Sequence, residues 1–421
     1  MSSGSGQSSL GLYLKGEKNK EYSWLHFIGT PDTKMIVENT RDITQRLLNI
    51  RQEWGRREEV TMEILPWYKQ FADESAISTL EKRVRGKHVY LFSDPHGDFN
   101  SKRKLEAKII EEIRSWLKPD DKGNISVDML DTFLKAWWNN IGELVSLARS
   151  LNDKVANDLF TLEAIQSNGA ETTNLVMLAM AFGRQDRPTS GKRQPHTFDL
   201  VWRWISNMTR SKGYVIDLDL HNPASESALQ WTQFINLYTG WFIEKCLESM
   251  QKDKANIRLS SADQWGDKKI EWIAKDKKLW HITVIKTRDY SKENTVKWTK
   301  FIGDIKWKDI LIHDDIIDTG GTLCSLLEQM LERQPKSINI AITHWMFHGK
   351  AYERLQKVIE NSNGIIEKVY VTNSINKENL PEYVTQIDTS NILANTIMGV
   401  HTREGVNRDD DTDYFKIVSE S

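Results

Sequence analysis

The most informative segment of this 421-residue chain is Ile312-His-Asp-Asp-Ile-Ile-Asp-Thr-Gly-Gly-Thr322. Its apolar residues lead into two neighbouring carboxylates and then a glycine pair flanked by threonines. This order predicts a buried strand, a tight loop and the first turn of a helix. Asp314 and Asp315 stand where the strand ends, which is where α/β sheets bind ligands, and they are suited to ribose hydroxyls. The segment therefore predicts both an α/β fold and a ligand site.

The loop after this strand is predicted to bind an anion. Thr319, Gly320, Gly321 and Thr322 offer backbone N–H groups and hydroxyls at a helix N-terminus, where a phosphate is favoured. The alternative is a plain turn in which Asp318 caps the helix. Because two acids, a glycine pair and two threonines coincide, we favour a ribose-phosphate site that includes Asp318.

Strand-like and helix-like segments alternate along most of the chain. Short apolar runs predict strands over 88–92, 174–182, 213–220, 256–260, 281–285, 310–313, 337–343 and 369–372. A period near 3.6 predicts helices over 197–209, 228–251, 268–278, 322–333 and 351–359. Such alternation is typical of α/β domains with parallel sheets. A continuous helical pattern at about 101–171 interrupts it and predicts a helical insertion.

Composition excludes several classes of protein. The 57 Lys and Arg residues are balanced by 59 Asp and Glu, so a strongly basic nucleic-acid binder is not expected. The two cysteines, Cys246 and Cys324, are too few for a disulfide framework or a four-cysteine zinc site, which favours the cytoplasm. No apolar run approaches 18 residues, so a membrane partner is not expected either.

The segment 312–322 resembles the phosphoribosyl-diphosphate binding loop of type I phosphoribosyltransferases and of ribose-phosphate pyrophosphokinases. Further motifs, spread over roughly 71–99 and 174–401, occur in the order seen in the pyrophosphokinases. The resemblance implies two type I phosphoribosyltransferase-like α/β domains with parallel sheets and a helical insertion in the first. It also implies an enzyme that transfers the β,γ-diphosphate of ATP to the 1-hydroxyl of a ribose 5-phosphate moiety and releases AMP.

ATP is the co-substrate that the resemblance implies. Residues 182–187, Phe-Gly-Arg-Gln-Asp-Arg, resemble the family's ATP-binding segment, and residues 71–75 resemble the segment that holds adenine. The family's usual Glu in the second segment is Ser75 here, so the adenine contacts follow the pattern less closely. Solvated surface charge and core packing are the alternatives. The residues expected to bind ATP are Phe71, Asp73, Arg184, Gln185, Arg187 and Arg193.

The resemblance also implies Mg²⁺ as cofactor and a flexible catalytic loop. His221 ends a motif whose histidine is linked to the metal, and Asp263 is the carboxylate of the matching second-domain loop. Lys286 and Arg288 begin the catalytic loop and are expected to stabilise charge in the transition state. A core histidine, an N-cap and surface charges are the respective alternatives. The segment Asp94-Pro-His-Gly-Asp98 replaces the family's usual polar loop, and its role is left open.

Two acceptors fit the same ribose-phosphate loop. Free ribose 5-phosphate would give phosphoribosyl diphosphate (PRPP). ADP-ribose would give ADP-ribose 1-pyrophosphate for rebuilding NAD, as in a phage branch of the family. The chain has 16 Trp, and Trp265 replaces a small residue in the predicted metal loop, which makes it a candidate platform for an extra base. A phosphoribosyltransferase that uses PRPP and a non-catalytic regulatory relative are the alternative functions.

The chain is predicted to have five parts. Residues 1–19 form a flexible leader, 20–222 an N-terminal pyrophosphokinase domain, and 223–389 a C-terminal phosphoribosyltransferase-like domain. Residues 390–405 form a helix that returns to the first domain, and 406–421 an acidic tail. By resemblance the protein is a homo-oligomer, a dimer or a hexamer, in the cytoplasm, or in the host cytoplasm if phage-encoded.

Overall fold

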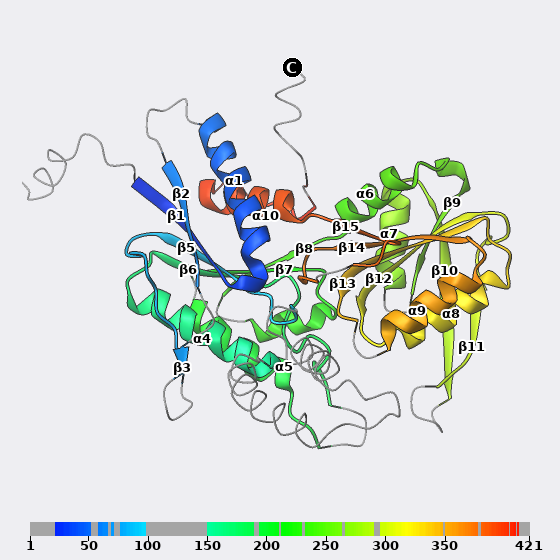
Figure 1. The fold of residues 1–421 in the computed structure, drawn as a ribbon, viewed down its shortest axis with the longest axis horizontal. Helices are drawn as coiled ribbons and strands as arrows, with labels where there is room; N and C mark the ends of the chain where they lie inside the picture. The colour runs from blue at the N-terminus through cyan, green and yellow to red at the C-terminus, as the bar shows by residue number, and fades with distance from the viewer. Residues whose placement is uncertain are drawn as a thin grey trace, which may run out of the picture.

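The chain folds into two α/β units that lie side by side (Figure 1). The computed structural model describes residues 22–51, 58–65, 69–70, 76–97, 150–188, 193–209, 212–229, 232–262, 266–289, 295–347, 350–377, 380–403, 405–409 and 411. None of the helices in these ranges is both long enough and apolar enough to cross a membrane. The predicted α/β class with parallel sheets is confirmed.

The first sheet has six parallel strands in the order β2-β1-β5-β6-β7-β8. They are β1 (Tyr22–Gly29), β2 (Glu58–Ile64), β5 (His88–Phe92), β6 (Thr172–Val176), β7 (Tyr214–Leu218) and β8 (Gln233–Leu237). The short strands β3 (Lys69–Gln70) and β4 (Ala76–Ile77) form a separate antiparallel pair. The central strands are buried on both faces, as expected for a sheet with helices on either side.

Helices cover both faces of the first sheet. Helices α1 (Lys34–Arg51) and α10 (Ser390–Thr402) lie on one face, and α4 (Leu151–Ser167) and α5 (Thr197–Thr209) lie on the other (Figure 1). Side chains of β7 alternate between the two cores, because Ile216 packs on the α1 and α10 side and Val215 on the α4 and α5 side.

The second sheet has seven strands in the order β11-β10-β9-β12-β13-β14-β15, and only β10 and β11 pair antiparallel among its described strands. The strands are β9 (Ile257–Ser261), β10 (Trp280–Asp289), β11 (Thr295–Ile302), β12 (Asp309–Ile317), β13 (Ser337–Trp345), β14 (Ile366–Thr372) and β15 (Val384–Ile387). Its helices are α6 (Gly240–Met250), α7 (Asp267–Asp276), α8 (Gly321–Leu331) and α9 (Ala351–Asn361). Helices α6 and α7 share one core, and α8 and α9 share the opposite one.

The chain passes between the two units twice. It leaves the first sheet after β8 to enter α6, and it returns from β15 into α10, which packs on α1. Three short 3₁₀ turns complete the described elements: η1 (Pro31–Thr33), η2 (Pro223–Ala228) and η3 (Lys254–Asn256). The first sheet therefore extends to Leu237, while the division into domains that the sequence suggests stays a prediction.

Two expected elements differ from the structure. The helix predicted over 228–251 is wrong in its first half, because 233–237 form the edge strand β8 and the helix begins only at Gly240. Ile235 and Leu237 are buried on one face of this strand, a short alternation that the longer helical period hides. The strand predicted over 174–182 ends at Val176, and the buried residues that follow form a loop at its carboxyl end.

Some predicted segments lie outside the described residues. The whole leader falls there, as does the acidic tail beyond 411, and the helical insertion is described only from residue 150. Its last part contains α4, whose first turn begins with a capping box between Ser150 and Asp153.

Candidate active site

A shallow cavity, partly open to solvent, lies at the junction of the two units. Its walls come from the loop after β6, from the end of β7, and from the ends of β12 and β13. These are carboxyl ends of parallel strands, where α/β proteins bind their ligands. Several of the residues that the sequence singles out meet around it.

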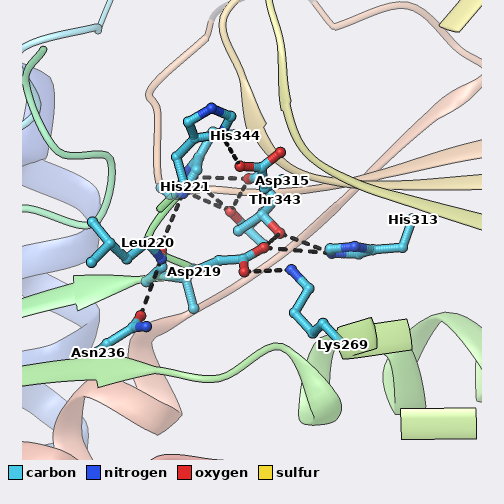
Figure 2. A network of polar contacts seen from close by, with 12 residues as sticks. Asp219, Leu220, His221, Asn236, Lys269, His313, Asp315, Thr343 and His344 are labelled. Atoms are coloured by element: carbon cyan, nitrogen blue, oxygen red, sulfur yellow. Dashed lines mark hydrogen bonds and ion pairs between the residues drawn. The ribbon is translucent and has the colours of Figure 1, made fainter. Parts of the chain in front are cut away.

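His221 and Asp315 join the two units at this cavity (Figure 2). His221 follows β7, Asp315 belongs to β12, and Nδ1 of His221 lies 2.5 Å from Oδ2 of Asp315. The hydrogen bond to Asp315 raises the pKa of His221. Burial alone would raise the pKa of Asp315, but the hydrogen bond and the charge of His221 bring it below its ordinary value. The predicted metal-linked histidine and a predicted ribose ligand are therefore direct partners.

Asp219 is the centre of the same network (Figure 2). It follows β7 with a positive φ of 58°, and its carboxylate reaches into the second unit. Lys269 Nζ of α7 lies 2.5 Å from Oδ1, and the hydroxyl of Thr343 donates to Oδ2 at 2.7 Å. Burial opposes ionisation of Asp219, yet the charge of Lys269 holds its pKa below the ordinary value. The end of β7 is thus embedded in the second unit.

Two buried histidines complete this wall. His344 Nε2 donates to the carbonyl of Leu218 at 2.7 Å, and its Nδ1 lies 2.9 Å from the hydroxyl of Ser374. His313 Nε2 lies 3.2 Å from the hydroxyl of Thr343. Burial, followed by the charge of Lys269, lowers the pKa of His313 to about 3, so its imidazole is neutral at physiological pH. His344 therefore bonds across the junction, whereas His313 bonds to Thr343 of its own unit and its Nε2 lies 3.6 Å from Oδ2 of Asp219.

The predicted ribose-phosphate loop has the expected strand–loop–helix form. Asp314 and Asp315 lie in β12, and α8 begins at Gly321 after Gly320, which has a φ of 72°. Gly320 is the N-cap residue and makes no side-chain cap bond, so Asp318 is not the N-cap as the alternative interpretation had it. The N-cap residue of α8 therefore has no side chain that could compete with an anion for the first N–H groups of the helix.

Two guanidinium groups flank this loop. Arg184 Nη1, from the predicted ATP segment of the first unit, lies 2.9 Å from Oδ2 of Asp318. Arg354 of α9 donates to the carbonyl of Thr319 at 3.2 Å. Thr319, Gly321 and Thr322 are exposed beside them, so a bound phosphate would meet positive charge from both units.

The other ATP candidates occupy the surface beside Arg184. Gln185, Arg187 and Arg193 are all exposed, and Arg187 lies 4.0 Å from its neighbour Asp186. The segment starts at Phe182, whose φ of 60° is unusual for a bulky side chain. Of these candidates, Arg184 is the one that the described contacts bring onto the ribose-phosphate loop.

The remaining predicted residues cannot be placed by their side chains. Phe71, Asp73, Asp263 and Trp265 lie outside the described residues. The backbone of Lys286 and Arg288 lies in β10, which continues to Asp289 where the sequence suggested that a loop had already begun. In the antiparallel pair with β11, Lys286 faces Thr299 and Arg288 faces Val296.

A second buried polar cluster lies at the end of β5, where the chain carries Asp94-Pro-His-Gly. The backbone N–H of Asn376, from the second unit, donates to Oδ2 of Asp94 at 2.6 Å. Lys154 Nζ of α4 donates to the carbonyl of Gly97 at 2.7 Å and lies 3.1 Å from Asp32. The cluster ties the two ends of segment 98–149 to each other and to the neighbouring unit.

Part of the chain matches the model of a known protein family. Residues 274–373 match the phosphoribosyl transferase domain model. A ribose-phosphate pyrophosphokinase of Ureaplasma parvum is 30% identical over 233 residues, which are 55% of this chain and 68% of the relative. The chain belongs to the ribose-phosphate pyrophosphokinase family.

Further similarities agree with membership of this pyrophosphokinase family. The ribose-phosphate pyrophosphokinase of Campylobacter jejuni is 29% identical over 259 residues, covering 61% of this chain and 78% of the relative. The crystal structure of phosphoribosylpyrophosphate synthetase from Mycobacterium smegmatis has the same fold, with a TM-score of 0.62 at 17% identity over 90% of this chain and 99% of that one. The present chain is therefore a diphosphokinase of the type that synthesises PRPP.

Sequence reasoning missed several residues at the junction of the two units. Lys269, Thr343 and His344 stand in segments that match family motifs, but the sequence alone assigned no partner to them. Asp219 likewise stands two residues before His221 without a predicted role. The alternation of acidic and apolar residues in 217–221 was the available signal, because a carboxylate in a buried strand needs a partner.

Proposed function

We propose that this enzyme transfers the β,γ-diphosphate of ATP to the 1-hydroxyl of a ribose 5-phosphate moiety and releases AMP. The observation that carries the proposal is the ion pair between Arg184 and Asp318. These residues belong to the predicted ATP segment and the predicted ribose-phosphate loop, which come from different units and meet beside one cavity. A reaction between two bound substrates needs such a junction, because its rate depends on holding both in register.

The charged groups suit diphosphoryl transfer. Charge builds up on the transferred group, and the enzyme must neutralise it without a GxxxxGK[ST] phosphate loop. Arg184 of the first unit and Arg354 beside the N-terminus of α8 supply positive charge from opposite sides. In this proposal Gln185, Arg187 and Arg193 extend the ATP site, and Phe71 and Asp73 hold the adenine. Lys286 and Arg288 stabilise the transition state.

Magnesium fits the donor groups of the junction. The described residues include no group of three or more His, Cys, Asp or Glu side chains arranged to hold a metal. Mg²⁺ does not require one, since it keeps several waters and is shared with substrate phosphates. In this proposal Asp263, together with His221 through a metal-bound water, would hold it, and the ion would neutralise diphosphate charge.

The acceptor is either ribose 5-phosphate or ADP-ribose. Both carry the same ribose 5-phosphate moiety, and the exposed loop at Thr319, Gly321 and Thr322 suits either. Trp265, our candidate platform for an adenine of ADP-ribose, lies outside the described residues, as does segment 98–149 of the insertion. We expect the enzyme to act as a homo-oligomer in the cytoplasm, and light scattering of the purified full chain measures its assembly.

Release of AMP from ATP tests the function. The full chain is incubated with ATP and Mg²⁺ plus ribose 5-phosphate, ADP-ribose or no acceptor, and nucleotides are separated by chromatography. We expect AMP with at least one acceptor and none without, and loss of the reaction when Mg²⁺ is chelated. Lys286→Ala should abolish it, whereas Lys357→Ala on the exposed face of α9 should not.

The outcomes separate the alternatives. If no AMP is released with ribose 5-phosphate and none with ADP-ribose, the diphosphokinase assignment for these substrates is overturned. Consumption of PRPP and a free base without ATP would instead indicate a phosphoribosyltransferase. A full-rate Lys286→Ala enzyme would remove the catalytic assignment and leave the family membership intact.

A further inference from the structure

Asp217 is a buried carboxyl group that the proposed reaction does not use. It lies in β7 between Ile216 and Leu218, which are fully buried toward the α1 and α10 side. The alternation of the strand directs Asp217 to the opposite face, that of Val215, whose core includes Met180. Only 1% of Asp217 is exposed.

One oxygen of this carboxyl group lacks a hydrogen-bond partner. Oδ2 of Asp217 is buried, and no donor among the described residues reaches it. Burial, opposed by a hydrogen bond from the backbone of Leu218, raises the pKa of Asp217 well above the ordinary carboxyl value. A buried polar atom left unpaired destabilises the folded state, so natural proteins retain one mainly where it has a role.

Asp217 also lines the cavity at the junction. The other acidic and imidazole groups on its wall are already engaged: Asp219 with Lys269, His221 with Asp315, and His344 with Leu218 and Ser374. The rest of the wall is mainly apolar, with Ala179, Met180, Leu220, Ile316 and Met346. In a pocket of this kind, a few polar groups decide which ligand is accepted.

We propose that Asp217 is a specificity-determining residue that hydrogen-bonds a sugar hydroxyl of a bound substrate, directly or through one water molecule. The inference rests on the proposed function. The cavity touches both the loop that leads to Arg184 and the strand that carries Asp315, so the hydroxyl comes from the ribose of ATP or from that of the acceptor. A carboxyl group, ionised or neutral, can pair with a hydroxyl, whereas the apolar wall cannot.

Calorimetric titration of ligands that differ by one hydroxyl tests this. ATP, 2′-deoxy-ATP and 3′-deoxy-ATP are titrated into the full chain with Mg²⁺. Ribose 5-phosphate and its 2-deoxy and 3-deoxy forms are titrated in the presence of α,β-methylene-ATP. The proteins are the wild type, Asp217→Leu, Asp217→Asn and the exposed control Asp304→Asn, so the experiment needs no turnover.

One of the tested hydroxyls should show the effect. For that hydroxyl, the wild type and Asp304→Asn should bind the complete ligand about tenfold tighter than the deoxy form. In Asp217→Leu that ratio should fall to about one, and Asp217→Asn, which still forms hydrogen bonds, should lie between. The ligand series that shows the loss identifies the source as ATP or acceptor. If Asp217→Leu does not fold, Asp217→Asn alone must still show a reduced ratio.

Two results would overturn the inference. Equal ratios for every hydroxyl in the wild type and both Asp217 variants would make Asp217 a structural residue only and leave the proposed function standing. Failure of the wild type to bind ATP would remove the proposed co-substrate, and with it the proposed function and this inference together.

Discussion

Arg184 and Asp318 are 134 positions apart in the sequence and belong to different units, yet Nη1 of Arg184 lies 2.9 Å from Oδ2 of Asp318. Both side chains are partly exposed, so the pair adds little to stability. The pair is important because it lies where the two units meet. Arg184 contacts the loop that we assign to the ribose phosphate, so its guanidinium lies where the two predicted substrate sites meet.

Replacing Arg184 should impair catalysis more than folding. We expect Arg184→Ala to lower kcat/KM for ATP about 100-fold, because a guanidinium aimed at the transferred group acts on its developing charge. Asp318→Asn should have a smaller effect on ATP and a larger one on KM for the acceptor. Steady-state rates of AMP release measure both. Arg203→Ala, whose guanidinium contacts only its own helix in the described structure, is the control.

Asp158 should make stability depend on pH. It is buried, it accepts a hydrogen bond from Ser93 at 2.6 Å, and burial raises its pKa from 3.8 to about 7. Between these values the unfolded chain releases the proton and the folded protein retains it. The contribution to the free energy of unfolding therefore falls as the pH rises from about 4 to about 7, and it is constant above that.

Asp158→Asn should remove this contribution. Relative to the wild type, the variant should gain about 2–4 kcal/mol between pH 4 and pH 8, because a carboxyl pKa that is higher by about 3 in the folded protein than in the unfolded chain corresponds to about 4 kcal/mol. Urea unfolding at pH 4.5, 6 and 8 measures the difference. A difference between the two proteins that stays constant over this range would show that Asp158 titrates normally.

Asp217→Leu should stabilise the free enzyme. The change removes an unpaired polar oxygen from an apolar core, and replacing buried polar groups by apolar ones of similar shape is neutral or stabilising. We expect an increase in Tm of about 2–5 °C by calorimetry without ligand. A lower Tm would indicate that the carboxyl group has a structural partner in the folded chain.

Segment 98–149 should be replaceable by a short Gly/Ser linker. Lys154 binds both Gly97 and Asp32, so its bonds hold the flanking ends together without the segment. We expect the shortened protein to keep the Tm of the full chain within a few degrees and to release AMP with ribose 5-phosphate. Comparison of the two acceptors in both proteins then shows whether the segment selects ADP-ribose. Aggregation of the shortened chain would mean that the segment covers part of the core.

The sequence was most informative where local patterns are strong. The run 312–322 predicted the strand, the loop and the helix start, because apolar residues, acids and glycines each restrict the backbone differently. It was least informative for β8, where a five-residue edge strand buries only one face. The helical period of the residues around Ile235 outweighed that short alternation.

Contacts between the units were beyond sequence reasoning. The sequence marked His221 and Asp315 as separate site residues, but their direct bond depends on how two sheets are placed. The same holds for Asp219, whose partners Lys269 and Thr343 come from distant elements. Periodicity describes which face of a strand is buried, and it carries no information on which other segment covers that face.

The double passage of the chain between the units limits how the site can open. One crossing runs from β8 into α6 and the other from β15 into α10, so two covalent links join the units. A pair of links permits rotation about the line through them and opposes free separation. The two links, together with the buried bonds of Asp219 and His344 across the junction, therefore keep Arg184 beside the same loop.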